Sequence, residues 1–218
     1  MAVCGRFSMT LAIDELRGLI PFEISNAVTI VEPRYNIAPG TDVLCVARRQ
    51  DGLSRAGWMR WGYRLPWSSK PLVNARSESL WTKPVFRHAI QHRRCLVPAD
   101  SYYEWGPAPN RIPFRILPFP YRVVWLAGIY DVTREGTPTV AIVTRAARPD
   151  IIGVHHRMPV MFQEDAGQKW LDGDNLSDLL TKPYPHTLTV YPVTKDVNSP
   201  RHQGPQLHIP LLDNPLGP

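Results

Sequence analysis

The sequence is poor in cysteine and lysine, and it contains no long apolar segment. Its three cysteines, Cys4, Cys45 and Cys95, stand far apart, and none belongs to a CxxC pair. This spacing argues against a disulfide framework and gives no support for a zinc site. No apolar run approaches the roughly 18 residues that cross a bilayer, and residues 1–6 lack the apolar core of a signal peptide. We therefore expect a cytoplasmic protein with no membrane span, no metal and no other cofactor.

The basic residues are mostly arginine, and they gather in the middle of the chain. Arginine accounts for 20 of the 25 basic residues, and residues 44–122 hold 14 bases against four acids. Five of the seven tryptophans lie in the same segment. Because arginine grips phosphate in pairs and stacks on bases, this mixture indicates a nucleic-acid surface. An Arg-rich codon bias with an ordinary solvated face explains the composition equally well. Residues 163–180 contain five acids and one lysine. We expect this acidic segment to be either a surface that binds a partner or an ordinary solvated surface.

Strand-like segments outnumber helical ones and do not alternate with them. Helical spacing covers residues 13–20, 166–170 and 176–180, and β-rich runs cover residues 43–47, 94–97, 123–129, 139–144 and 187–193. The pattern predicts an α+β fold built on antiparallel sheet. No linker divides the chain, so we expect a single domain over residues 4–203 and a Pro-rich C-terminal tail over residues 204–218.

Two stretches place reactive groups at positions that a strand or turn would orient. Cys4 is followed by a glycine and by Arg6, so a thiol and a cation stand together. Asn74 and Arg76 alternate, and on an extended strand they face the same side. Taken alone, Cys4 fits a small core residue, and the Asn–Arg pair fits a structural tie.

Two further stretches combine a titratable group with a constrained backbone. Glu104 lies between aromatic residues, where burial would raise the pKa of its carboxyl. His155 and His156 precede Arg157 at a proline-stiffened turn. Taken alone, each also fits a structural role.

Taken in chain order, the motifs resemble those of the SOS-response-associated peptidase (SRAP) family of abasic-site-binding proteins. They are CGRF at 4–7, RYNIAPG at 34–40, RWG at 60–62 followed by Trp67, NARSE at 74–78, CLVPADSYYEW at 95–105, HHRMP at 155–159 and VTKDVN at 193–198. The resemblance spans nearly the whole chain, from about residue 4 to about residue 200.

The resemblance implies an SRAP-like fold, with antiparallel sheets forming a barrel-like core, few flanking helices and a positively charged groove for single-stranded DNA. It implies a catalytic set made of Cys4, Asn74, Glu104 and His155. It also implies DNA contacts from Arg6, Arg76, Arg157, Trp61 and Trp67. The expected partner is single-stranded DNA that contains abasic sites, and the protein is expected to act as a monomer associated with the nucleoid.

The chemistry implied by the resemblance needs a cysteine whose α-amine is free. An abasic site in its open form carries an aldehyde, which the amine converts to an imine before the thiol closes a thiazolidine ring. Here Ala2 and Val3 precede Cys4, whereas in the family the cysteine follows the initiator methionine directly. Translation could begin at Val3, the protein could cleave the Val3–Cys4 bond itself, or the chain could have lost the stable crosslink; we favour the first.

Two other functions remain open from the sequence. A cysteine peptidase or amidohydrolase would use Cys4 as nucleophile and His155 as base. A non-covalent single-stranded-DNA-binding module would use only the arginines and tryptophans.

Overall fold

The computed structural model describes residues 4–28, 31–49, 51–65 and 67–211. Residues Ala2 and Val3, and residues 212–218 of the expected tail, lie outside the described residues. The strands are β1 (Phe7–Met9), β2 (Glu23–Ile24), β3 (Arg34–Ile37), β4 (Asp42–Arg48), β5 (Ser54–Trp61), β6 (Tyr63–Leu65), β7 (Ser68–Leu72), β8 (Asn74–Arg76), β9 (Arg94–Ala99), β10 (Ser101–Trp105), β11 (Pro113–Phe119), β12 (Val124–Val132), β13 (Pro138–Ala146), β14 (Arg157–Pro159), β15 (Met161–Phe162) and β16 (Thr187–Pro192). The helices are α1 (Ile13–Leu19), α2 (Pro84–His92), α3 (Glu164–Asp172) and α4 (Leu176–Thr181), with short 3₁₀ helices η1 (Ser77–Ser79), η2 (Lys195–Asn198) and η3 (Pro205–His208).

The larger sheet closes on itself as a barrel. Strands β13, β12, β9, β4 and β5 are successive neighbours, and β5 returns to pair with β13. The neighbours in the ring are antiparallel, but the closing pair is parallel, with Thr139 opposite Arg60. β8 also pairs with β13 in parallel, and its Asn74 lies opposite Ile142. The α+β prediction with a barrel-like core is confirmed. The parallel pairs that β13 forms with β5 and β8 add to the antiparallel sheet that we expected.

A second, five-stranded sheet connects the start of the chain to its middle. Its order is β16-β11-β10-β1-β3, and all its pairs are antiparallel. β1 pairs with β10 so that Phe7 lies opposite Tyr102. This register brings two motifs that are about 100 residues apart into contact, because Cys4 then lies beside the end of β10.

Large aromatic side chains and the thiols of Cys45 and Cys95 fill the core. Trp61, Trp125 and Trp170 are fully buried, and the Trp170 Nε1–H donates to the Cys95 carbonyl at 2.9 Å. Cys45 and Cys95 are buried next to each other, and burial raises the pKa of the Cys45 thiol. Both therefore behave as small core residues.

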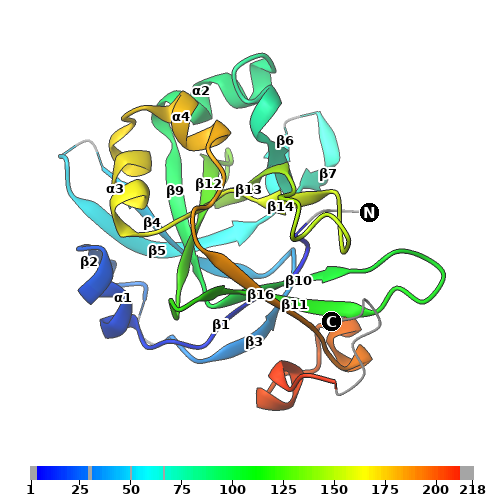
Figure 1. Cartoon of the computed structure of the whole chain (residues 1–218). Coiled ribbons are helices and arrows are strands. Elements are labelled where there is room, and N and C mark those ends of the chain that lie inside the picture. Colours follow the sequence, from blue (N-terminus) through cyan, green and yellow to red (C-terminus); the bar gives the residue numbers. More distant parts are fainter. Residues whose placement is uncertain (1–3, 29–30, 50, 66, 212–218) are drawn as a thin grey trace.

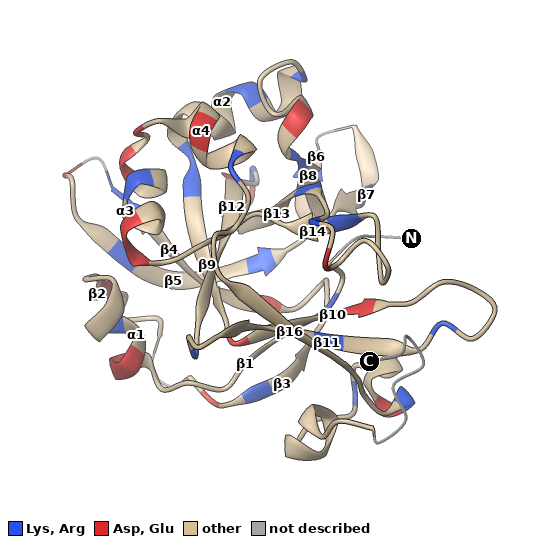
Figure 2. Cartoon of the chain, viewed as in Figure 1, with Lys and Arg blue, Asp and Glu red and all other residues tan. Residues whose placement is uncertain are grey.

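The helices cover one end of the barrel, as Figure 1 shows for α2, α3 and α4. α3, α4 and α1 occupy the three segments with predicted helical spacing. α2 was not predicted, although Pro84 at its first turn and the buried Phe86, Ala89 and Ile90 are ordinary helix signals. Figure 2 shows the acidic residues of the 163–180 segment along α3 and α4. Within the described ranges, no helix has the length and apolar character needed to cross a membrane.

Residues 204–211, which the sequence assigned to the tail, pack against the smaller sheet. Leu207 of η3 is fully buried with Tyr103, and the Leu211 amide donates to the Pro192 carbonyl at 2.9 Å. The His208 ring lies 4.8 Å from the Tyr35 ring, and its Nε2 is buried without a hydrogen-bond partner among the described residues. Residues 204–211 are therefore part of the packed structure around the smaller sheet.

Because the His208 ring is largely buried, we expect the folded protein to lose stability in acid. Burial first, and the nearby Arg115 second, lower the pKa of His208 to about 4. The unfolded chain binds this proton near pH 6.5, so stability is complete above that pH and declines as pH falls toward 4. Because the site is partly open to solvent, we expect the wild type to lose about 1–2 kcal/mol more than His208→Phe between pH 7 and pH 5. Urea unfolding measures this difference; parallel pH profiles for the two proteins would contradict it.

Candidate functional site

The centre of the candidate site is a contact between Cys4 and Glu104. The backbone nitrogen of Cys4 donates to Glu104 Oε1 at 2.6 Å. Cys4 is fully buried, Glu104 is 2% exposed, and Cys4 has a positive φ of 45° that turns the chain toward β10. A thiol, a backbone nitrogen and a carboxyl group are thereby held together in an enclosed space.

Burial keeps both side chains of this pair neutral. It raises the pKa of Glu104 to about 8, and the Cys4 N–H opposes this in part by favouring the carboxylate. Burial first, and Glu104 second, raise the pKa of the Cys4 thiol well above its ordinary value. At neutral pH the pair therefore consists of a carboxylic acid, able to donate a proton, and an unionised thiol.

Arg6, two residues after Cys4, connects β1 to β3 and η2 through hydrogen bonds. Its Nη1 donates to Asn36 Oδ1 at 2.7 Å and to the Val197 carbonyl at 2.6 Å, and its guanidinium lies 5.8 Å from the Trp105 ring centre. Asn36 Nδ2 also donates to the carbonyls of residues 197, 199 and 202. Four of the motifs noted in the sequence, from residues 4–7, 34–40, 95–105 and 193–198, converge on this one side chain.

A hollow of about 430 Å³ opens beside Gly5 and Arg6. Its lining includes the cations Arg6, Arg111 and Lys195 and the amides Asn110 and Asn198. The Trp105 indole N–H donates to Asn198 Oδ1 at 2.7 Å and so forms one wall. The lining contains three cations and no acid, which suits an anionic ligand.

Asn74 and Arg76 lie on β8, which a buried tryptophan, Trp61, connects to β1. Trp61 contacts the Phe7 ring at 5.1 Å and donates from Nε1 to the Val73 carbonyl at 3.0 Å. β1 and β8 are thus held near each other through Trp61. Arg76 is exposed and Asn74 is half-buried.

Arg157 joins two of the predicted motifs by an ion pair. Its guanidinium binds Glu78 with both nitrogens, at 2.5 and 2.9 Å, and donates to the Thr144 carbonyl at 2.7 Å. Its side chain is only 11% exposed. The pair lowers the pKa of Glu78 and ties the segment after β8 to β14 across β13.

His155 stands next to the Arg157–Glu78 ion pair. Its Nδ1 lies 3.1 Å from the Arg157 amide nitrogen and 3.3 Å from the Arg157 carbonyl oxygen. Burial lowers the pKa of His155, so the ring is neutral at pH 7. The His156 ring stacks on it at 4.4 Å.

The two predicted tryptophans differ in position. Trp67 is 74% exposed in the connection between β6 and β7, where an aromatic surface is available to a ligand. Trp61 has no exposed surface, so the expectation that it contacts flanking bases is corrected by its place in the core. Its role in the structure is to support β1 and β8.

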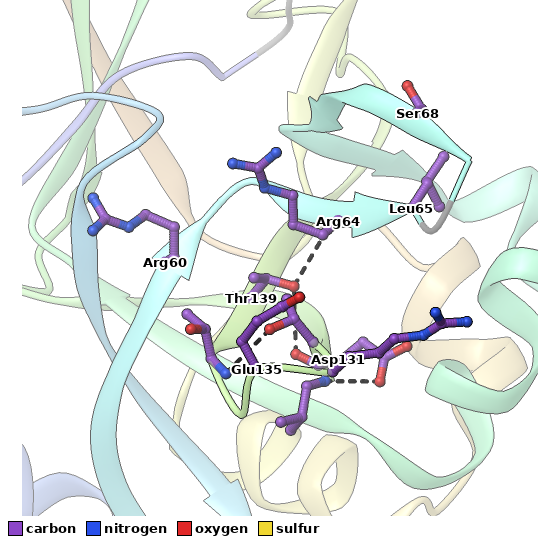
Figure 3. A pocket seen from close by; sticks show the side chains of 11 residues that line it. Arg60, Arg64, Leu65, Ser68, Asp131, Glu135 and Thr139 are labelled. Carbon is purple, nitrogen blue, oxygen red and sulfur yellow. Dashed lines mark hydrogen bonds between the residues drawn. The ribbon is translucent and has the colours of Figure 1, made fainter.

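A second hollow, of about 570 Å³, lies where β6 meets the β12–β13 hairpin. Figure 3 shows the Arg60 and Arg64 side chains pointing away from Asp131 and Glu135. None of the predicted site residues lines it. Among the residues that the structure describes, no group of three His, Cys, Asp or Glu side chains could hold a metal.

Sequence reasoning missed the residues that hold the site together. Asn36, Glu78 and Lys195 lie inside motifs that were recognised, but only contacts between distant segments reveal what they do. Arg111 lies in no recognised motif, and no local sequence signal would have selected it.

Comparison with known proteins places the chain in a defined group. It matches the family model described as SOS response associated peptidase (SRAP) over residues 3–200. It is 34% identical over 224 residues to Abasic site processing protein YoqW of Bacillus subtilis, covering 94% of this chain and 98% of that protein. Abasic site processing protein YoaM of the same organism is 32% identical over 222 residues, covering 94% and 97%. A solved protein from Bacteroides thetaiotaomicron shares the fold, with a TM-score of 0.81 and 22% identity over 96% of this chain and 100% of that one.

The buried Glu104 predicts that stability falls as pH rises. Its folded-state pKa is raised to about 8, so the unfolded chain releases the proton first and the folded state loses stability between about pH 4.5 and pH 8. Between pH 6 and pH 9 we expect the wild type to lose about 2 kcal/mol that Glu104→Gln does not lose. Urea unfolding of both proteins tests this, with the exposed Glu32→Gln as control. A Glu104→Gln profile that follows the wild type would refute the prediction.

Proposed function

The chain belongs to the SOS response associated peptidase family, and from that premise we propose that it is an abasic-site sensor that crosslinks to abasic sites in single-stranded DNA through Cys4. The product would be a thiazolidine that shields the lesion. The names of YoqW and YoaM, both abasic site processing proteins, support the choice of lesion.

The observation that carries the proposal is the 2.6 Å contact between the Cys4 nitrogen and the buried Glu104 carboxyl. Formation of an imine requires a nitrogen nucleophile and an acid that protonates the departing oxygen. Closure of the thiazolidine requires a thiol on the carbon next to that nitrogen. Cys4 and Glu104 supply all three groups in one enclosed place.

The surrounding residues fit supporting roles in this reaction. The neutral His155 ring can exchange protons with the opening sugar, and Asn74 can orient the oxygen of that sugar. The exposed Arg76 and Trp67 are available to a phosphate and to a base, as the proposal requires. Arg6 and Arg157 mainly brace the protein, because their guanidiniums already donate to protein acceptors.

The proposed reaction requires that Cys4 be the first residue of the active protein. In the sequence its nitrogen is joined to Val3, and an amide nitrogen does not form an imine. Translation from Val3 or cleavage of the Val3–Cys4 bond would each free the amine. A protonated amine so close to Glu104 would lower the pKa of that carboxyl, so one proton would be shared between the two groups.

The thiol environment favours crosslinking over the peptidase alternative. A cysteine nucleophile that attacks an amide is activated by a lowered pKa or by an adjacent base. Burial and Glu104 instead raise the pKa of Cys4. Addition to an iminium carbon needs a less activated sulfur nucleophile, because this carbon already carries positive charge.

We expect wild-type protein to form a denaturation-resistant band with single-stranded DNA that carries an enzymatically made abasic site. Cys4→Ala should form no thiazolidine, because the sulfur is absent, and its band should be lost on heating. Denaturing gel electrophoresis measures both outcomes. A heat-stable band of equal strength from Cys4→Ala would defeat the proposal.

Two controls complete this experiment. Undamaged DNA of the same sequence should give no band. Intact-mass analysis of the protein used should show Cys4 as the first residue; a terminus at Ala2 together with a stable crosslink would exclude the thiazolidine.

The exposed Arg76 should contribute to DNA binding through phosphate. We expect Arg76→Ala to weaken binding to single-stranded DNA of any sequence and to reduce the slope of log affinity against log salt by about one. Fluorescence anisotropy at several salt concentrations measures this slope. The exposed Arg134 on the β12–β13 hairpin provides a matched control; an equal loss from Arg134→Ala would show that only overall charge matters.

A further inference from the structure

Tyr102 carries a buried hydroxyl group that the fold does not use. Its side chain is 1% exposed, and its hydroxyl has no hydrogen-bond partner among the residues that the structure describes. A buried polar group without a partner lowers stability, so native proteins seldom keep one without a reason. Such a group within a reactive site points to a partner that arrives with the ligand.

The register of β10 places this hydroxyl in the site. Tyr102 and Glu104 alternate along the strand, so both project from the same face. Cys4 is bonded to Glu104 and shares the buried core with Tyr102. Tyr103 projects from the opposite face, and its hydroxyl donates to the Tyr35 carbonyl at 2.8 Å. Of these two adjacent tyrosines, Tyr103 has a hydroxyl with a protein partner, and Tyr102 has a hydroxyl without one among the described residues.

Burial and the nearby acids keep the Tyr102 hydroxyl protonated. Burial raises the pKa of Tyr102 well above its ordinary value, and Glu104, Cys4 and Asp150 raise it further, whereas Arg148 lowers it. Tyr102 therefore keeps its proton at neutral pH and can act as a hydrogen-bond donor.

We propose that the Tyr102 hydroxyl donates a hydrogen bond to the aldehyde-derived oxygen of the abasic site while Glu104 protonates that oxygen. This assignment rests on the proposed function. It makes Tyr102 a further catalytic residue of the same reaction, since it touches the oxygen that departs.

The Cys4 amine adds to the aldehyde carbon, and the aldehyde oxygen becomes a hydroxyl group. Glu104 gives its proton to this hydroxyl, the carbon–oxygen bond breaks with its electron pair on oxygen, and water leaves as the nitrogen lone pair forms the iminium. The thiol then passes its proton to the Glu104 carboxylate, and the sulfur closes the ring. The hydrogen bond from Tyr102 lowers the barrier to the departure of water.

The test compares Tyr102→Phe with Tyr103→Phe, which remove the same atom from opposite faces of one strand. Borohydride trapping on single-stranded DNA with an abasic site measures the rate of imine formation. Anisotropy with a tetrahydrofuran site, which has no aldehyde, measures binding alone, and thermal unfolding measures stability.

We expect Tyr102→Phe to slow imine formation about tenfold, the effect of one hydrogen bond, with unchanged affinity for the tetrahydrofuran site. It should be at least as stable as the wild type, because an unpartnered hydroxyl is removed. Tyr103→Phe should be less stable and should react at the wild-type rate.

The outcomes separate this inference from the proposed function. A wild type that reacts and a Tyr102→Phe variant that reacts equally fast would overturn the role of Tyr102 and leave the proposed function intact. A Tyr102→Phe variant with lower stability and weaker binding would also overturn it, since the hydroxyl would then be structural. A wild type that forms neither imine nor crosslink would defeat the proposed function itself.

Discussion

One buried hydrogen bond, from the Cys4 nitrogen to the Glu104 carboxyl, is the contact on which the rest of the site depends. It exists because β1 pairs with β10 in a register that sets Phe7 opposite Tyr102. A slip of one residue would turn Glu104 to the other face of the sheet. Burial of the Glu104 carboxyl raises its pKa to about 8, so Glu104 is protonated and can act as an acid at neutral pH.

The arginine-rich composition has a structural cause as well as a functional one. Arg94 donates to carbonyls at the ends of α2 and α3, and Arg148 donates to the carbonyls of residues 184 and 186. Arg6 and Arg157 likewise tie distant segments together. A planar guanidinium can satisfy several carbonyls at once, which a lysine ammonium does less well. Only exposed members such as Arg76 are free to serve the positively charged surface that the composition suggested.

The two faces of β10 differ in how their polar side chains are hydrogen-bonded. On one face, Ser101 accepts a hydrogen bond from Arg115, and Tyr103 is bonded to Tyr35. On the other face, Glu104 remains desolvated and Tyr102 lacks a protein partner. The satisfied face anchors the strand, and this allows the other face to hold polar groups at a cost in stability. Reactive sites commonly keep such groups.

Local pattern predicted the α+β class and five of the strands, β4, β9, β12, β13 and β16. It succeeded there because strand preference and alternation depend on neighbours in the chain. The roles of Cys4, Asn74, Glu104 and His155, which motif order indicated, stay predictions. The sequence could not show that β5 closes the barrel on β13, that Trp61 is enclosed, or that Arg157 holds Glu78. It also did not single out the hydroxyl of Tyr102 from that of Tyr103. Those properties depend on which distant segments meet and on the water that their contact excludes, and only the tertiary structure determines both.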